Sequence, residues 1–231
     1  MKKLTPEQKR DAAKSAIVRV GDGGRGFIVS AGEYDRYIVT AAHCLPHIPR
    51  PHLANGTTEL TFPKIIGALS DRKARMIWGE LCVASITDDL AVLRAPDDGD
   101  PILNVECTEY KKFTKPAIRI ARPPAPAQYL NVPRKDLAAL GLQFDPDPMA
   151  AFILSLDGEW QSCAVQNTGR FLIIGDGGEN IKSGMSGSPI INIDGAAIGL
   201  VSTGDRTLNM HPSLMDCLPP WLLCELDVRK S

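Results

Sequence analysis

The stretch "IKSGMSGSPIIN", residues 181–192, holds a serine between glycines and then runs through a small residue and a proline into an apolar segment. Gly184 precedes Ser186 by two residues and Gly187 follows it directly. The entrance to a strand needs no such glycine, whereas a backbone that turns sharply favours residues without a Cβ. The stretch therefore predicts a tight loop that presents Ser186 in front of a strand.

Outward from this loop, the chain consists of short β-branched runs separated by Gly, Pro, Asn and Asp. The runs of the first half cover residues 16–20, 26–30, 36–40, 59–62, 75–78, 81–86 and 90–95, and those of the second half cover 151–165, 170–175, 189–193 and 196–202. Residues 151–165 are predicted to form a hairpin that turns at Asp157-Gly158. Strands at this spacing indicate a sandwich or barrel. The proline-rich segment 121–134 predicts a stiff linker between two β-rich lobes.

Helices are predicted only near the two ends. Thr5 followed by Pro6, with Gln8 three residues after the cap, is typical of a capping box at a helix start. Residues 213–229 have apolar side chains at helical spacing, and Pro219-Pro220 can begin a fresh turn, so a closing helix is expected there.

A glycine pattern in the first half matches the spacing of a dinucleotide-binding loop. Gly21, Gly23 and Gly26 fit GxGxxG, but such a loop must open a helix whose N-terminus holds the pyrophosphate. The next segment, "FIVSAG", has the pattern of a strand. The glycines therefore predict a turn between two strands, and no dinucleotide cofactor.

Composition and charge exclude several classes of protein. The chain has 231 residues, 44% of them hydrophobic, and a formal net charge of -1. Without a dense basic tract, neither nucleic acid nor a membrane surface is expected as a partner. There is no apolar run of the roughly 18 residues that a membrane span needs, and the first residues lack the apolar core of an export signal, so a cytoplasmic protein is expected.

The six cysteines show no metal-binding spacing and no CxxC pair. Without an export signal we expect six reduced thiols, most of them packed as small hydrophobic residues. They are Cys44, Cys82, Cys107, Cys163, Cys217 and Cys224. No metal and no organic cofactor is expected.

Three short stretches supply the residue types of a nucleophilic site. "VTAAHC" contains His43, "TDDLAVLRA" contains Asp89, and "SGMSGSP" contains Ser186. A nucleophilic hydroxyl needs a base, and the base needs an orienting carboxylate. Because the first two residues lie in the first half and Ser186 in the second, the reaction is expected at the seam between the lobes. Asp88 competes for the carboxylate role, but Asp89 directly precedes the "LAVL" strand.

These motifs resemble those of the trypsin-like, chymotrypsin-fold serine peptidases, and "SGSP" is similar to their bacterial members. The resemblance covers about residues 16–221 and rests on "TAAHC", "DLAVL" and "GMSGSP" in the family's order. It implies a single all-β peptidase domain over 1–231, with two six-stranded antiparallel barrels and the active site in the cleft between them. The implied lobes are 16–110 and 115–210, followed by the closing helix at 213–229.

The resemblance also implies roles for individual residues. The N–H groups of Gly184 and Ser186 would form an oxyanion hole, which a side chain at position 184 would crowd. His43 would carry the proton between Ser186 and the leaving amine, while Asp89 holds the imidazole. Residues implied to bind substrate are Asn180 at the base of the specificity pocket and the strand Ser202, Thr203 and Gly204.

The specificity residues depart from two familiar preferences. The absence of an acid at Asn180 disfavours substrates with Lys or Arg, and Val201 stands where glutamyl endopeptidases carry a histidine. A neutral, small-to-medium substrate side chain is therefore expected. His47, His52 and His211 are interpreted as surface residues.

Two further departures concern control. Met185 occupies the position of the acid that pairs with a newly cut N-terminus in many secreted relatives, and no disulfide partner for Cys44 is evident. We therefore expect a regulated intracellular protease of narrow specificity that acts on a protein or peptide. Its control is expected from an activating or regulatory partner, from an appended domain encoded elsewhere, or from the narrow substrate range itself. The alternative is a peptide-binding pseudoprotease, or a protease inactive until a partner binds. An esterase is disfavoured because a strand, and not a helix, follows Ser186.

Overall fold

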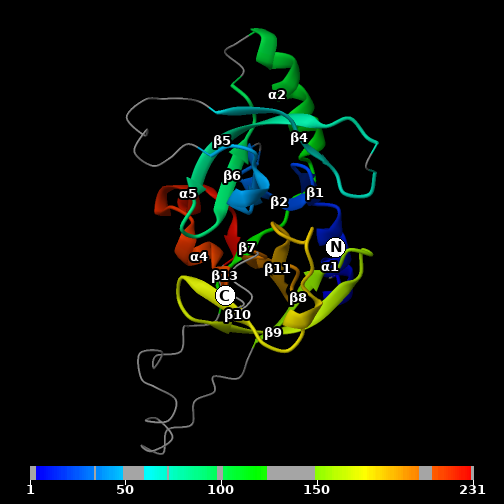
Figure 1. Cartoon of the computed structure of the whole chain (residues 1–231), viewed down its shortest axis with the longest axis vertical. Helices are drawn as coiled ribbons and strands as arrows, with labels where there is room; N and C mark the ends of the chain where they lie inside the picture. Colours follow the sequence, from blue (N-terminus) through cyan, green and yellow to red (C-terminus); the bar gives the residue numbers. More distant parts are fainter. Residues whose placement is uncertain are drawn as a thin grey trace, which may run out of the picture.

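The computed structural model describes residues 4–33, 35–48, 60–71, 73–97, 101–123, 149–202 and 210–229. The described chain forms two β-rich lobes, with the first lobe above the second in Figure 1. The first lobe is a closed antiparallel barrel with the strand order β1-β2-β3-β6-β5-β4. Its strands are β1 (Ile17–Val20), β2 (Gly24–Ala31), β3 (Asp35–Thr40), β4 (Thr61–Ala68), β5 (Ile77–Ser85) and β6 (Leu90–Arg94). This barrel confirms the predicted class for the first half.

The second lobe is a curled sheet of eight strands in its described part, in place of the expected six. The order is β13-β10-β9-β8-β11-β12-β7-β14. Its strands are β7 (Ile120–Ala121), β8 (Met149–Leu154), β9 (Trp160–Asn167), β10 (Phe171–Ile174), β11 (Pro189–Asn192), β12 (Ala197–Leu200), β13 (Met210–Pro212) and β14 (Val228–Arg229). β7 and β14 add to one edge as two-residue parallel strands, which are too short to leave a sequence pattern.

The predicted strands and turns are largely confirmed. β8 and β9 pair as the expected hairpin, and Gly158 adopts a φ of +85° at its turn. The turn predicted from the GxGxxG pattern lies between β1 and β2, with Gly24 already in the second strand. The runs at 75–78 and 81–86 belong to one strand, β5, whose pairing with β6 shifts between Leu81 and Val83. A bulge of this kind breaks the alternation that would reveal one long strand.

Burial follows the alternation of apolar residues in the strands. The first lobe buries β-branched and aromatic side chains such as Phe27, Ile38 and Ile66, and the second buries Ile153 and Ile190. One apolar cluster extends from the first barrel to residues of β8, β11 and β12, and a second, smaller cluster lies within the second lobe. The two lobes therefore share apolar packing in addition to the polar contacts at the site.

Helix α1 (Pro6–Lys14) connects the two lobes. Its predicted capping box is present, because Thr5 Oγ1 accepts from Gln8 N at 3.3 Å and Gln8 Oε1 accepts from Thr5 N at 3.0 Å. The helix leads directly into β1 of the first lobe, yet its side contacts the second. Lys9 Nζ lies 2.7 Å from Asp194 Oδ1, and the indole N–H of Trp160 donates to the carbonyl of Arg10 at 3.0 Å.

Helix α2 (Pro101–Phe113) was not predicted. It packs against β5, with the buried Tyr110 hydroxyl donating to the carbonyl of Leu93 at 3.2 Å. The signal that could have revealed it is the buried series Cys107, Tyr110 and Thr114, which has helical spacing. No described helix has both the length and the apolar character that crossing a membrane requires.

The closing helix predicted over 213–229 is wrong. The segment contains two short helices, α4 (Leu214–Cys217) and α5 (Pro220–Glu225), followed by β14. Leu218 and Pro219 separate the helices in extended conformation, with ψ of 142° each. Each of these two residues precedes a proline, which disfavours the helical region. The paired prolines therefore end α4 and allow α5 to begin at Pro220.

Gly187 provides a test of how closely the lobes approach. Its φ is +84°, and a Cβ there would overlap the carbonyl oxygen of Arg25 in the first lobe. Gly158 has nearly the same φ, +85°, but no heavy atom within 4 Å of an added Cβ. We expect Gly158→Ala to lower the free energy of unfolding by about 1–2 kcal/mol from backbone strain alone, and Gly187→Ala to lower it considerably more. Denaturant unfolding of both variants measures the difference, and equal losses would contradict the close approach.

Candidate active site

Ser186 lies on a tight loop between η3 (Gly178–Asn180) and β11. Gly184 and Gly187, with φ of +92° and +84°, give the loop its turns. Three backbone hydrogen bonds close it: Met185 N to Lys182 O at 3.1 Å, Ser188 N to Met185 O at 2.9 Å, and Gly187 N to Val201 O at 2.7 Å. The loop is thus a fixed element of the second lobe, as the glycine pattern predicts.

The N–H groups of Gly184 and Ser186 are the two predicted oxyanion donors. Within the described part of the chain, neither donates to a backbone or side-chain acceptor. A Cβ at Gly184 would make only ordinary contacts with the protein, 3.5 Å from Gly23 O and 3.6 Å from Leu156 Cδ2. Position 184 therefore favours glycine because of its positive φ, and not because a Cβ would clash with the protein.

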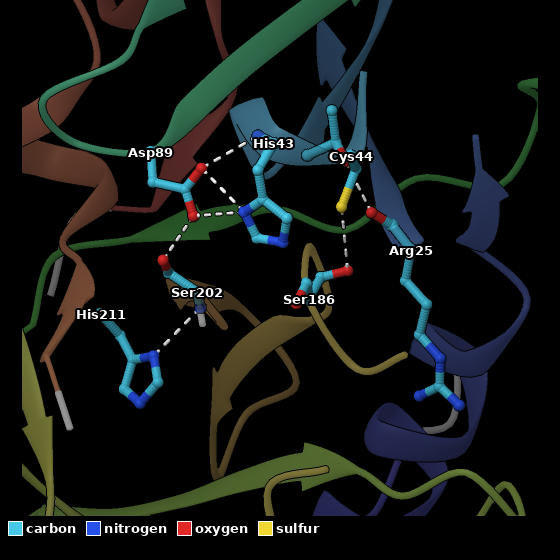
Figure 2. A network of polar contacts seen from close by, with 8 residues as sticks. Arg25, His43, Cys44, Asp89, Ser186, Ser202 and His211 are labelled. Atoms are coloured by element: carbon cyan, nitrogen blue, oxygen red, sulfur yellow. Dashed lines mark hydrogen bonds and ion pairs between the residues drawn. The ribbon is translucent and has the colours of Figure 1, made fainter. Parts of the chain in front are cut away.

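His43 lies in η1 (Ala42–Cys44), the single turn that follows β3. Its Nδ1 lies 2.7 Å from Asp89 Oδ2 and 2.9 Å from Oδ1, and its backbone N–H donates to Oδ1 at 3.0 Å. An Nδ1 that donates to a carboxylate leaves Nε2 as the acceptor in the neutral imidazole. Figure 2 shows the ring lying beside Ser186, with its second nitrogen on that side.

Asp89 contacts both lobes. It comes directly before β6 with a φ of +51°, and its carbonyl accepts from Ala42 N at 3.1 Å. Its carboxylate also accepts a short hydrogen bond from the hydroxyl of Ser202 in the second lobe (Figure 2). The Ser202 side chain, predicted only as part of a substrate-binding strand, thus contacts Asp89. Thr203 and Gly204, the rest of that predicted strand, lie outside the described residues.

The electrostatics of the pair favour its charged form. The hydrogen bond to Asp89 raises the pKa of His43 above its ordinary value. Burial acts to raise the pKa of Asp89, but hydrogen bonds from His43 and Ser202 outweigh it and lower that pKa. A proton that arrives on the imidazole is therefore stabilised by the carboxylate.

Asp88, the competing carboxylate, points elsewhere. It is buried, and Arg170 from the second lobe forms two short hydrogen bonds to it. Of the two adjacent aspartates, Asp89 is the one that contacts His43.

Arg25 is a site residue that sequence reasoning missed. Its backbone N–H donates to the carbonyl of Ser186 at 2.7 Å, so β2 of the first lobe holds the serine loop of the second. Its buried guanidinium donates to the carbonyls of Leu154 at 2.6 Å and Ser155 at 2.9 Å, and to Ser188 Oγ at 3.4 Å. Burial lowers the pKa of Arg25, but a guanidinium stays protonated in proteins. The only sequence feature that could have indicated this role is a charged residue between Gly24 and Gly26.

The two lobes line one open cleft of about 1530 Å³. His43 and Cys44 line it from the first lobe, and Gly184, Ser186 and Leu156 line it from the second. This arrangement suits an extended chain lying across both lobes more than a small enclosed ligand. In the described residues no three His, Cys, Asp or Glu side chains gather as metal ligands.

The remaining predicted specificity and control residues belong to the segment that leads into Ser186. Asn180 ends η3, where it is half-buried and its backbone N–H donates to Gly177 O at 3.2 Å. Met185 is fully buried, and its sulfur lies 3.3 Å from Lys182 N. An apolar side chain is therefore buried directly before Ser186 in the loop.

Of the other histidines, His47 is exposed and His52 lies outside the described residues. The prediction that His211 is a surface residue is wrong: it is 2% exposed, and its Nδ1 accepts the backbone N–H of Ser202 at 3.1 Å (Figure 2). Its short strand, β13, pairs with β10, a long-range contact that the local sequence does not reveal.

All six cysteines belong to the described residues and none forms a disulfide there. The sulfur of Cys44 faces Gly24, where a Cβ would overlap it. Because Gly24 has no side chain, it cannot form a disulfide with Cys44.

Comparison with known proteins identifies several similar chains. Residues 24–200 match the family model described as trypsin-like peptidase domain. No curated protein matches the sequence. A human pathogenic astrovirus serine protease is 15% identical over 89% of this chain and 94% of its own, with a TM-score of 0.48. The serine endoprotease from Yersinia pestis is 17% identical over 93% of this chain and 64% of its own, with a TM-score of 0.49. The Rv3671c protease from M. tuberculosis in its active form is 12% identical over 96% and 85%, with a TM-score of 0.48.

The buried His211 predicts a specific loss of stability in acid. Burial lowers its pKa to about 4, whereas an unfolded histidine titrates near 6.5. Between these values the unfolded chain binds more protons, so stability falls as pH decreases from about 6.5 towards 4. We expect this group to cost the wild type about 2 kcal/mol between pH 7 and pH 5.

Urea unfolding of His211→Asn at both pH values tests this, because Asn retains an acceptor for Ser202 N–H without titrating. The variant should lose less stability than the wild type, while His47→Asn, at an exposed site, should follow the wild type. Equal pH dependence in all three proteins would show that His211 is not the group responsible.

Proposed function

Because the chain belongs to the trypsin-like peptidase domain family, we propose that it is a serine endopeptidase that hydrolyses peptide bonds through an acyl-enzyme. The observation that carries the proposal is the pairing of His43 Nδ1 with Asp89 at 2.7 Å, at the edge of the cleft that Ser186 lines from the other lobe. A base with a fixed tautomer and a serine on a rigid loop are the two parts that nucleophilic catalysis requires.

In the proposed reaction Ser186 is the nucleophile and His43 carries the proton. Ser186 Oγ attacks the substrate carbonyl as its proton passes to His43 Nε2, and Asp89 stabilises the imidazolium that forms. The oxyanion of the tetrahedral intermediate accepts from the N–H groups of Gly184 and Ser186. His43 then gives its proton to the leaving amine. Water, deprotonated by His43, attacks the ester and releases the acid and the free Ser186 hydroxyl.

The substrate is proposed to be an extended segment of a protein or peptide. The cleft is open and formed by both lobes, which fits a backbone lying across it. Asn180 offers no charge for a basic substrate side chain, which favours a neutral residue before the cleaved bond. An intracellular, reducing setting, in which the six cysteines remain thiols, is part of the proposal. With Met185 in place of an acid, control by a second protein remains part of the proposal.

Covalent labelling tests the proposed nucleophile. A fluorophosphonate probe should label the folded wild type at Ser186, located by mass spectrometry, and label neither Ser186→Ala nor His43→Ala. Labelling requires the base and the oxyanion donors together. A folded wild type that is not labelled would favour the alternative, a peptide-binding pseudoprotease or a protease that needs a partner.

The role of Asp89 has its own quantitative test. Asp89→Asn should lower kcat by about 10⁴-fold, because the amide favours the wrong imidazole tautomer. The activity of the wild type should rise with pH as His43 loses its proton, above the ordinary pKa of histidine, since Asp89 raises that pKa. An Asp89→Asn variant with wild-type kcat would remove Asp89 from the mechanism.

Cleavage of a peptide library tests the specificity. The wild type should cut after neutral, small-to-medium residues. Asn180→Asp should shift the preference towards Lys and Arg, since a carboxylate would pair with a cationic substrate side chain. Wild-type cleavage after Lys or Arg would contradict the proposed pocket.

A further inference from the structure

The two adjacent aspartates Asp88 and Asp89 are held by different partners. Asp88 lies in the turn between β5 and β6 of the first lobe, and its side chain is 1% exposed. Arg170, in the turn between β9 and β10 of the second lobe, donates to both of its carboxylate oxygens through Nε and Nη2. The hydroxyl of Ser85 adds a third hydrogen bond, at 2.5 Å. A buried carboxylate with three donors is fixed in position.

We infer that Arg170, acting through Asp88, positions Asp89 for its contact with His43. The inference rests on the proposed function, because it assigns Arg170 and Asp88 to the positioning of the proposed base. It makes the ion pair between the lobes part of the active-site assembly, although neither residue contacts His43 in the described hydrogen bonds.

The backbone of Asp89 shows why such support is needed. A φ of +51° is unfavourable for a residue with a side chain, and it persists only when the surroundings fix it. Asp89 N donates to Ile86 O at 3.2 Å, which closes the turn from one side. The anchored Asp88 fixes the turn directly before the strained residue, so that the next carboxylate faces His43.

Arg170 is itself held at the backbone. Its carbonyl accepts from Ser213 N at 3.0 Å and from the thiol of Cys217 at 3.0 Å, at the two ends of α4. The connection therefore runs from α4 through Arg170 and Asp88 to Asp89. The second lobe also contacts Asp89 through the hydroxyl of Ser202. Together these contacts give the second lobe, which carries Ser186, two separate contacts with the carboxylate turn of the first.

The burial of Asp88 as a charged carboxylate depends on Arg170. Burial acts to raise the pKa of Asp88, but hydrogen bonds from Arg170 and Ser85 outweigh it and lower that pKa. Without the guanidinium, a buried carboxylate would remain uncompensated, which is strongly unfavourable. The turn would have to move Asp88 towards water, and Asp89 would move with it.

The chain contains a matched pair for comparison. Glu80 is also 1% exposed and accepts from Arg94, whose side chain is 46% exposed, compared with 56% for Arg170. Glu80 and Arg94 belong to β5 and β6 of the same barrel, away from the turn that carries Asp89. Loss of Arg94 thus removes an arginine from a buried carboxylate without touching the contact between the lobes.

The experiment compares Arg170→Ala, Arg170→Lys and Arg94→Ala in the full chain. One readout is kcat and KM on a peptide that the wild type cleaves. The other is the downfield proton resonance of His43 Nδ1–H, which reports the hydrogen bond to Asp89 directly and disappears in Asp89→Asn. We expect Arg170→Ala to lower kcat by about 10²-fold, as a small displacement of a catalytic group does, and to shift or broaden the resonance. Arg170→Lys should retain part of both, and Arg94→Ala should change neither.

A folded Arg170→Ala protein with kcat within about threefold of wild type, far from the roughly 10²-fold expected for displacement, and an unchanged resonance would overturn the inference. So would an Arg94→Ala variant with the same losses, because the effect would then be general destabilisation. If Arg170→Ala does not fold, Asp88→Asn replaces it, since it removes the buried charge, and the same losses are expected. If the wild type has no peptidase activity, the proposed function fails while the resonance alone still decides the role of Arg170.

Discussion

The hydrogen bond from Arg25 N–H to the carbonyl of Ser186 is the contact on which the site depends. It joins a barrel strand of one lobe to the backbone of the proposed nucleophile in the other. Its length of 2.7 Å requires the two backbones to approach closely, and Gly187 makes that approach sterically feasible. The guanidinium of the same residue then reaches the end of β8 and Ser188. Arg25 thus joins the serine loop to β2 of the first lobe and to the end of β8 in the second.

The carboxylate side of the site is held in the same way, by contacts that cross between the lobes. Asp89 carries a strained φ in the first lobe and accepts from Ser202 in the second. Ser202 is in turn held by the neutral, buried His211. One apolar cluster extends across both lobes and holds them together. These polar contacts, whose geometry is directional, then fix how His43 is placed relative to Ser186. Buried polar networks of this kind specify one arrangement because each unsatisfied member would be costly.

The sequence predicted what is local and left out what is not. The strands, the Asp157-Gly158 turn and the capping box at Thr5 follow from short stretches of the sequence. The contact between Asp89 and His43, which are 46 residues apart, was implied by the family resemblance. Arg25 and Arg170 were missed because their side-chain partners lie far away in the chain. The burial of His211 was missed because it depends on the long-range pairing of β13 with β10. The closing helix failed for a local reason, since each residue before a proline at 219 and 220 avoids the helical region. β7 and β14 have two residues each, too few for any periodicity.

Met185 shows how the serine loop holds its shape without a charge. An acid buried at this position would need a cationic partner, since an uncompensated buried carboxylate is costly. The fully buried thioether has no such requirement, and the loop closes through hydrogen bonds from Met185 N to Lys182 O and from Ser188 N to Met185 O. The loop's conformation therefore does not depend on an ion pair that a cut N-terminus would supply.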